Sequence, residues 1–247
     1  MKKSIVSLLI MILAATGAFT QEMNITKNLE IWLKADALSG IKDGDAIGAW
    51  ADASANKADF SSPTLVKRPI FKANFANGKP GLAFSGAQGM TTSKKYSLKD
   101  FTVFIVFKDD GIATEYERLV DHNYANGFWT GRNKGETNSW GGGIKASDTP
   151  YGNFTAFSDS TPNLMIFCRK GDVQSIFGSC ASPVQGNVSD GSTAEGPITV
   201  GCWNDMETNQ NQWLTGQIAE VLIYSVALSD ADLKNVGTYL RNKYAIK

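Results

Sequence analysis

The chain has 247 residues, and its 24 basic and 24 acidic side chains leave no net formal charge. The charges are dispersed, without the basic stripe or arm that neutralises phosphates, so nucleic acid is excluded as the expected partner. No internal repeat, heptad pattern or linker-like tract interrupts the chain, and its length suits one large core, so we expect a single domain over residues 24–247.

The first 18 residues have the pattern of an export signal. Two lysines precede an apolar run over residues 5–15, and small residues follow at positions 16–18. The run is shorter than the roughly 20 apolar residues that span a bilayer, so we expect no transmembrane segment. We expect a signal peptide over residues 1–18, cleaved after Ala18 or as late as residue 20, and a secreted or periplasmic mature protein of net charge about −2.

Short apolar and aromatic runs, separated by Gly, Asn, Asp and Pro, recur through the rest of the chain and are typical of strands. The run FTVFIVFK is apolar on both faces, which predicts a strand in mid-sheet that is covered on both sides. Many strands without alternating helices indicate a sandwich of two antiparallel sheets. The clearest strands are expected at residues 29–35, 80–86, 101–108, 163–169, 173–180, 197–203 and 217–224, and long polar loops at 131–160 and 182–196.

Three cysteines, Cys168, Cys180 and Cys202, are an odd number for an exported protein. A hairpin turning at residues 170–172 would place Cys168 opposite Ser175. Cys180 would then lie about 16 Å further along the strand, too far for a disulfide bond. We therefore expect buried thiols, with a bridge to Cys202 as the alternative.

The segment 216–247 joins a last strand to a helix. Ser229 is a predicted N-cap with Asp232 three residues later, a variant of the capping box. Apolar residues then recur at helical spacing, at Leu233, Val236, Leu240 and Tyr244. We expect an amphipathic helix that packs on the body and covers an edge or the end of the sandwich.

Four stretches carry a family resemblance: LEIWLKADALSGIKDGDAIGAWADASANKADF, RPIFKANFANGKPGLAFSG, FTVFIVFK and GQIAEVLIYSVALSDADLKNVGTYLRNKY. In this order they resemble the signatures of exported bacterial laminin-G-like domains of the concanavalin A-like lectin/glucanase superfamily. The resemblance implies an all-β jelly-roll sandwich of two curved antiparallel sheets with a C-terminal helix. It leaves the function open, because the superfamily includes lectins, adhesion modules, glycosidases and polysaccharide lyases.

Patterns that indicate catalysis are weak. His122 is the single histidine, no Gly-x-Ser-x-Gly elbow is present, and we expect a loop or strand-end histidine. The Glu-x-Asp-x-x-Glu or Glu-x-Asp-x-Glu string of the superfamily's glucanases is also absent. Two acid pairs have same-face spacing in polar surroundings, and we interpret them as solvated turn carboxylates: Glu115 with Glu117, and Asp205 with Glu207. We predict no catalytic residue, with a glycoside hydrolase or polysaccharide lyase as the alternative.

Glu220 lies among apolar residues of the last predicted strand. A buried acid needs a partner, so we expect a structural pairing with Arg or with backbone donors.

Asp52, Ser54, Asn56 and Asp59 place oxygen donors at alternate positions, as a calcium loop does. The positions at which an EF-hand needs Gly and Glu are occupied by Lys and Pro instead. We therefore expect Asx-turn hydrogen bonds, with calcium binding as the alternative and no other cofactor.

Aromatic side chains lie in or beside the long polar loops, mixed with amides and carboxylates. Sugar sites combine such groups, because an aromatic plate covers the apolar face of a sugar while polar groups bind its hydroxyls. We predict a lectin-like protein that binds extracellular or cell-surface glycan, with a protein-contact or adhesion module as the alternative. The predicted stacking residues are Trp140 and Trp203, and the other candidates are Trp129, Tyr151, Asn204, Asp205 and Trp213, with core packing as the alternative for each aromatic.

Overall fold

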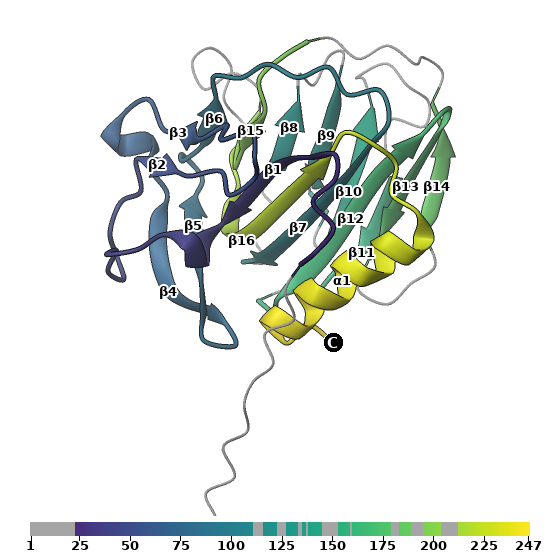
Figure 1. Cartoon of the computed structure of the whole chain (residues 1–247). Coiled ribbons are helices and arrows are strands. Elements are labelled where there is room, and N and C mark those ends of the chain that lie inside the picture. Colours follow the sequence, from purple (N-terminus) through teal and green to yellow (C-terminus); the bar gives the residue numbers. More distant parts are fainter. Residues whose placement is uncertain are drawn as a thin grey trace, which may run out of the picture.

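The computed structural model describes most of the chain after residue 22. The described residues are 23–110, 116–122, 127–132, 135–136, 138–144, 153–158, 160–178, 183–188, 195–203 and 212–247. Within them, two antiparallel sheets pack face to face and one α-helix lies against the outside of the first sheet (Figure 1). The predicted fold class, an all-β sandwich with a C-terminal helix, is confirmed, while the predicted signal peptide lies outside the described residues.

The first sheet, sheet A, contains the longest strands. Its order is β14 (Val184–Asn187), β13 (Val173–Phe177), β12 (Asn163–Lys170), β7 (Phe101–Asp109), β16 (Thr215–Tyr224), β5 (Lys79–Ser85) and β4 (Ile70–Ala76). The strand β1 (Leu29–Lys34) pairs with the second half of β16.

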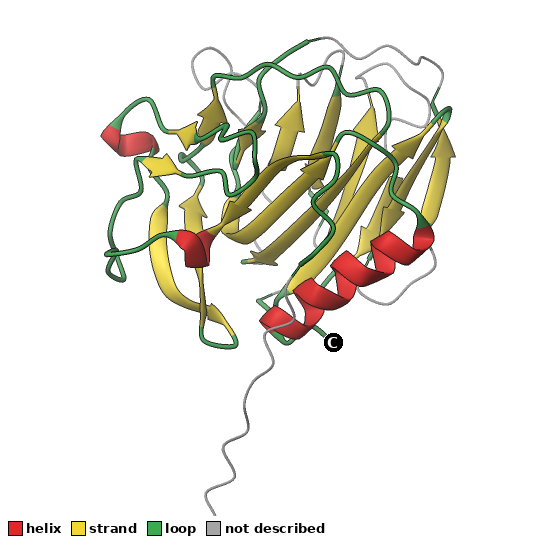
Figure 2. Cartoon of the chain, viewed as in Figure 1, coloured by secondary structure: helices red, strands yellow, loops and turns green. Residues whose placement is uncertain are grey.

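The second sheet, sheet B, contains several very short strands. Its order is β11 (Asn153–Ala156), β10 (Ser139–Ile144), β9 (Phe128–Arg132), β8 (Glu117–His122), β15 (Thr199–Val200), β6 (Met90–Thr92), β3 (Phe60–Ser61) and β2 (Ala49–Trp50). Two 3-10 turns, η1 (Ala35–Ala37) and η2 (Leu65–Lys67), lie in the connections before β2 and after β3 (Figure 2).

The strand β7 lies in the middle of sheet A, between β12 and β16, as predicted. Its alternate residues Phe101, Val103, Ile105 and Phe107 belong to the core between the sheets. Phe104 and Val106 belong to a second cluster on the outer face of the same sheet. Both faces of the strand are therefore apolar and both are covered.

The helix α1 (Asp230–Tyr244) covers that outer face. Ser229 is the N-cap, since its Oγ accepts a hydrogen bond from the backbone N–H of Asp232 at 3.2 Å. The inward side chains of the helix, among them Leu240 and Tyr244, share a cluster with Phe104 of sheet A. Packing on the body is confirmed, but the predicted cover of an edge or end is wrong: the helix covers a face, because that face is apolar.

Two segments interpreted as long loops contain strands instead. The segment 131–160 includes β10 and β11, and the segment 182–196 includes β14. The sequence of β10, SWGGGI, lacks the β-branched pattern of a strand. Its Gly142 faces the core, where a Cβ atom would lie 2.8 Å from the Phe167 ring, so a tertiary contact requires the glycine there.

The hairpin of β12 and β13 has the predicted register, with Cys168 opposite Ser175. The turn places Gly171 at φ 59°, a conformation that favours glycine. Cys168 forms no disulfide bond, and burial raises the pKa of its thiol to about 11. Cys202 is buried, and Cys180 lies outside the described residues.

Glu220 is fully buried and faces α1. A bulge between Ile218 and Glu220 turns Ile218 into the core, so the two side chains point to opposite sides of β16. The carboxylate accepts hydrogen bonds from Trp32 Nε1 at 2.6 Å, Lys243 Nζ at 2.7 Å and the Tyr244 hydroxyl at 2.8 Å. A structural pairing is confirmed, although its donors are Trp, Lys and Tyr side chains instead of Arg or backbone groups.

No helix in the described part of the chain is long and apolar enough to cross a membrane.

The buried pair of Glu220 and Lys243 gives a stability prediction. Lys243→Met should lower the free energy of unfolding by about 3 kcal/mol, because it leaves the Glu220 carboxylate buried without its cationic partner. Lys234→Met, at an exposed position of the same helix, is the matched control and should change stability by less than about 0.5 kcal/mol. Urea unfolding followed by fluorescence measures both. Equal midpoints for the two variants would contradict a stabilising role for the pair.

Candidate functional site

The outer face of sheet B differs in chemistry from the outer face of sheet A. Strand pairing places one residue of each neighbouring strand side by side, from β3 across to β10. The adjacent residues Phe60, Met90, Val200 and Phe128 belong to the core, so alternation directs this row outward. The transverse row consists of Ser61, Thr91, Thr199, Asp121, Trp129 and Gly143.

Exposure falls along the transverse row. Ser61 is exposed and Thr91 is half-buried, whereas Thr199, Asp121 and Trp129 have no exposed surface. The row therefore combines hydroxyl groups, one carboxylate and one indole without a large aliphatic side chain.

Arg118 lies beside the buried part of the row. Its guanidinium carbon is 4.5 Å from the centroid of the Trp129 ring, and its Nε is 4.0 Å from Asp121 Oδ2. A Cβ atom at Gly131 would lie 3.1 Å from Arg118 Nη1 and 2.0 Å from the Glu117 carbonyl oxygen, so this approach requires glycine. Arg118, Asp121 and Trp129 thus form a buried cluster in which the carboxylate and the ring face stabilise the cation.

Trp213 lies next to β6, near the exposed end of the transverse row. Gly89 precedes the core residue Met90, so its missing side chain would point outward. A Cβ atom there would lie 2.4 Å from Cys202 Sγ and 3.1 Å from Cζ3 of Trp213. Trp213 is half-buried, and Lys67 Nζ lies 3.8 Å from the centroid of its ring. This places a partly exposed indole and a cation together beside the polar face.

The predicted aromatic residues have different environments in the structure. Trp203 and Trp213 are half-buried and keep exposed surface. Trp140 is fully buried in the core, with its ring centroid 5.1 Å from that of Phe107. Tyr151, Asn204 and Asp205 lie outside the described residues.

These positions correct the choice of two stacking residues. Trp140 and Trp129 present no accessible ring face to a sugar, because each is enclosed by other side chains. Trp140 also donates an Nε1 hydrogen bond to Asp109 Oδ2 at 2.8 Å. Core packing, the alternative for each aromatic, applies to both.

An ionic cluster inside the sandwich joins the two sheets. Arg132 Nη1 lies 3.0 Å from Asp109 Oδ1 and 2.9 Å from Oδ2, and Arg132 Nη2 lies 2.7 Å from Glu117 Oε2. Asp109 ends β7 of sheet A, whereas Glu117 and Arg132 belong to β8 and β9 of sheet B. The interpretation of Glu117 as a solvated turn carboxylate is wrong, because Arg132 provides a buried partner that the local sequence does not reveal.

Burial raises the pKa of Glu117 to about 7, although the Arg132 guanidinium beside it lowers the pKa in part. Asp109 and Asp110 add to the rise, since a second negative charge disfavours ionisation. Both carboxylates of the cluster are buried and contact the same cation, so they do not flank a substrate groove as a glycosidase pair would.

His122 is buried at the end of β8, as expected for a strand-end histidine. Its Nε2 lies 2.8 Å from the Tyr96 carbonyl oxygen, and its ring packs 5.6 Å from that of Phe128. Burial lowers the pKa of the imidazole, against the backbone contacts with Tyr96 and Gly196, which raise it. These contacts support a structural role.

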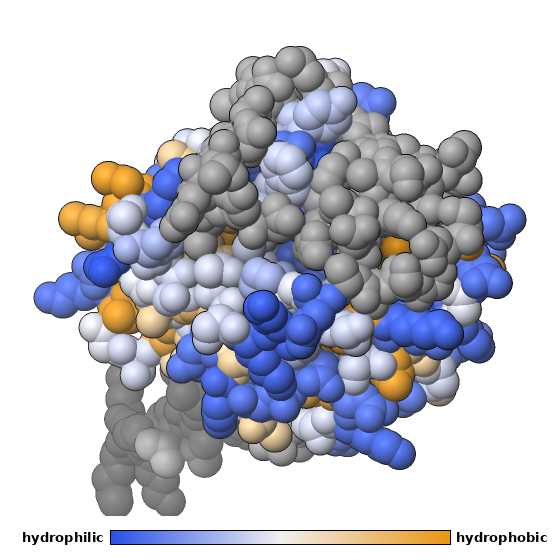
Figure 3. All heavy atoms as spheres, turned by 90° about the horizontal axis from the view of Figure 1, so that it is seen from above, coloured by the Kyte–Doolittle hydropathy of each residue, from blue (hydrophilic) through white to orange (hydrophobic). Residues whose placement is uncertain are grey.

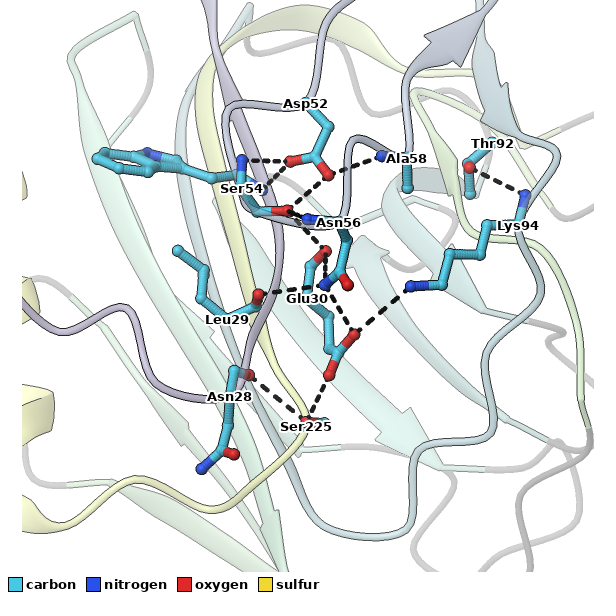
Figure 4. A network of polar contacts seen from close by, with 11 residues as sticks. Asn28, Leu29, Glu30, Asp52, Ser54, Asn56, Ala58, Thr92, Lys94 and Ser225 are labelled. Atoms are coloured by element: carbon cyan, nitrogen blue, oxygen red, sulfur yellow. Dashed lines mark hydrogen bonds and ion pairs between the residues drawn. The ribbon is translucent and has the colours of Figure 1, made fainter.

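The Asp52 loop forms the Asx-turn network that its spacing predicts (Figure 4). Asp52 Oδ1 accepts from the backbone N–H groups of Trp32 and Ser54 at 2.8 and 2.9 Å. Asp52 Oδ2 accepts from Ser54 Oγ at 2.6 Å and from the N–H of Ala58 at 2.9 Å. The carboxylate thus organises its own loop. Nowhere in the described part of the chain do three His, Cys, Asp or Glu side chains gather in a group that could hold a metal ion.

No family model matches the chain, and no curated protein does. Solved structures with a similar fold include "Trypanosoma rangeli sialidase in complex with sialic acid", at TM-score 0.56 and 13% identity over 86% of this chain and 33% of that chain. They also include domain 4 of AbnA, a GH43 extracellular arabinanase from Geobacillus stearothermophilus, in complex with arabinotriose, at TM-score 0.57 and 13% identity over 85% and 98% of the two chains. The Ruminococcus gnavus IT-sialidase CBM40 bound to alpha2,3 sialyllactose has TM-score 0.50 and 14% identity over 64% and 95%.

The chain shares the β-sandwich fold of these proteins. It spans about a third of the length of the sialidase chain that it matches. At 13–14% identity the likeness shows the fold alone, and the laminin-G-like resemblance stays a resemblance.

Glu117 gives a pH prediction. Between pH about 4.5 and about 7 the unfolded chain ionises this residue while the folded chain keeps it protonated, so Glu117 lowers stability as the pH rises through this window. Below the window both states are protonated, so Glu117 adds no pH dependence to the stability there. As the pH rises, the free energy of unfolding of Glu117→Gln should therefore increase relative to that of the wild type, by on the order of 2–3 kcal/mol.

Urea unfolding of both proteins across this pH range measures the difference. Glu136→Gln, at an exposed position, is the matched control and should follow the wild-type pH dependence. A constant difference between wild type and Glu117→Gln at every pH would contradict the raised pKa.

Proposed function

We propose that this protein is an exported, lectin-like domain that binds glycan on the outer face of sheet B, beside Trp203 and Trp213. The partly exposed indole of Trp213, near the end of the transverse row where the exposed Ser61 and the half-buried Thr91 present hydroxyl groups, is the observation that carries the proposal. An indole can cover the apolar face of a sugar ring while polar side chains bind its hydroxyl groups.

Two further considerations support glycan binding. The solved structures with this fold include an arabinanase domain with arabinotriose and a CBM40 module with sialyllactose, so the fold is compatible with sugar recognition in other proteins. The predicted residues Tyr151, Asn204 and Asp205 are of the type that would complete such a site, and they stay part of the proposal.

Hydrolysis is favoured less than binding. The carboxylates Asp109 and Glu117 are both buried against Arg132, and Asp121 is buried beside Arg118. None of these three has the exposed position of an acid that protonates a glycosidic oxygen.

Tryptophan substitutions test the proposal. Trp213→Ala and Trp203→Ala should each weaken glycan binding by about 1–3 kcal/mol and leave the fold intact, by analogy with base stacking on aromatic side chains. Trp140→Ala is the contrasting variant and should cost about 3–5 kcal/mol of stability, because it empties part of the core.

A glycan array probed with the mature protein, with and without calcium, identifies a ligand for calorimetry of these variants. Unfolding of Trp213→Ala and Trp203→Ala, or no binding to any glycan in either condition, would reject the proposal. A dependence of binding on calcium would favour the alternative interpretation of the Asp52 loop.

A further inference from the structure

Two adjacent apolar side chains project into solvent at η2. Leu65 is 67% exposed and Val66 is 74% exposed. The other exposed large hydrophobic residues of the described part of the chain are Tyr116, Val173 and Val184, at 37–38%. Single exposed apolar residues are ordinary on protein surfaces, but a neighbouring pair at a tip forms a patch that favours contact with an apolar phase.

The backbone holds this tip in place. The N–H groups of Lys67 and Arg68 donate to the carbonyl oxygens of Thr64 and Leu65 at 3.1 and 3.2 Å, which closes a tight turn. The Lys67 carbonyl oxygen accepts from Ser62 Oγ at 3.2 Å and from the Gly89 N–H at 3.0 Å, which ties the turn to β6. Leu65 and Val66 are thus presented by a fixed turn.

The tip lies at the side of the molecule away from α1, near β2, β3 and β6 (Figure 1). Seen from above, apolar atoms project from the rim of the molecule on that same side (Figure 3). Nothing described therefore folds back over the two side chains, consistent with their exposure.

The side of the tip that faces Trp213 is cationic. Three described segments meet here through Gly89, which contacts Lys67 and Trp213: residues 61–69, 85–92 and 212–215. They contain Lys67 and Arg68 and not one Asp or Glu. On the other side of the turn, Arg68 packs on Gly48 in the segment 44–50, which bonds to Ser62 and Pro69 and contains Asp45. With Lys67 Nζ at 3.8 Å from the Trp213 ring, the tip combines aliphatic, cationic and indole groups. Side chains of these three kinds are enriched where proteins contact the interface of an anionic bilayer.

We propose that η2 is a membrane-docking tip, in which Leu65 and Val66 enter the interfacial region of a bilayer and Lys67 contacts anionic lipid headgroups. A lipid surface fits better than a protein partner, because two side chains are far fewer than the 20–30 residues a side of a stable protein interface. Insertion into lipid needs no complementary surface. Two apolar side chains bury fewer carbon atoms than a single myristoyl chain, so their attachment is weak and reversible and depends on the added headgroup contact of Lys67.

Vesicle co-sedimentation tests the proposal. The mature chain from residue 19, which includes every described element, avoids a contribution from the apolar run 5–15. It should bind vesicles of phosphatidylcholine with phosphatidylglycerol, more weakly at high salt, and bind pure phosphatidylcholine less. Leu65→Ser with Val66→Ser should lower the partition coefficient about tenfold or more. Lys67→Gln should weaken binding and reduce its salt dependence.

The matched control is Val173→Ser with Val184→Ser, which removes two exposed apolar side chains from β13 and β14. This variant should bind as the wild type does. No binding to either kind of vesicle, or equal losses in the two double variants, would overturn the proposal. A concentration-dependent dimer that Leu65→Ser with Val66→Ser abolishes, without vesicle binding, would overturn it in favour of a second copy as the occupant.

The vesicles carry no sugar, so their outcome is independent of the proposed glycan binding. Leu65→Ser with Val66→Ser should retain the glycan affinity of the wild type while losing vesicle binding.

Discussion

The structure depends on a strand that is apolar on both faces. The inner side chains of β7, such as Ile105, need a second sheet, and its outer side chains, such as Phe104, need a further cover. Sheet B provides the first cover and α1 the second. Burial of about 25 cal/mol per Å² of apolar surface drives both contacts, so the two layers on either side of sheet A follow from one alternating pattern.

The single described helix covers sheet A, and the outer face of sheet B has a different chemistry. Its transverse row needs no apolar cover, since residues such as Thr91 and Thr199 are polar. Two buried ionic contacts connect the layers. Glu220 and Lys243 join the helix to sheet A, and Arg132 joins the two sheets inside the sandwich. On the outer face of sheet B, the exposed Ser61 and the half-buried Thr91 are the members of the transverse row available for polar recognition, and they lie near the tip at η2.

Much of the fold could be predicted from local patterns. The alternation in β7, the cap at Ser229 and the hairpin register at Cys168 are each set by residues close together in the chain. The strand β10 escaped prediction because a run of glycines has no strand propensity of its own. Gly142 is required by the ring of Phe167, a residue 25 positions away.

The sequence by itself determined the all-β class, the central strand, the capped helix and the need of Glu220 for a partner, because alternation, capping and the cost of burying a charge act locally. Tertiary structure alone decided which partners are used. Glu220 contacts Lys243 and Trp32, and Glu117 contacts Arg132. Trp140 is buried in the core, whereas Trp213 keeps an exposed surface. The physical reason is that burial and ion pairing depend on which distant strands become neighbours, and no local spacing specifies that.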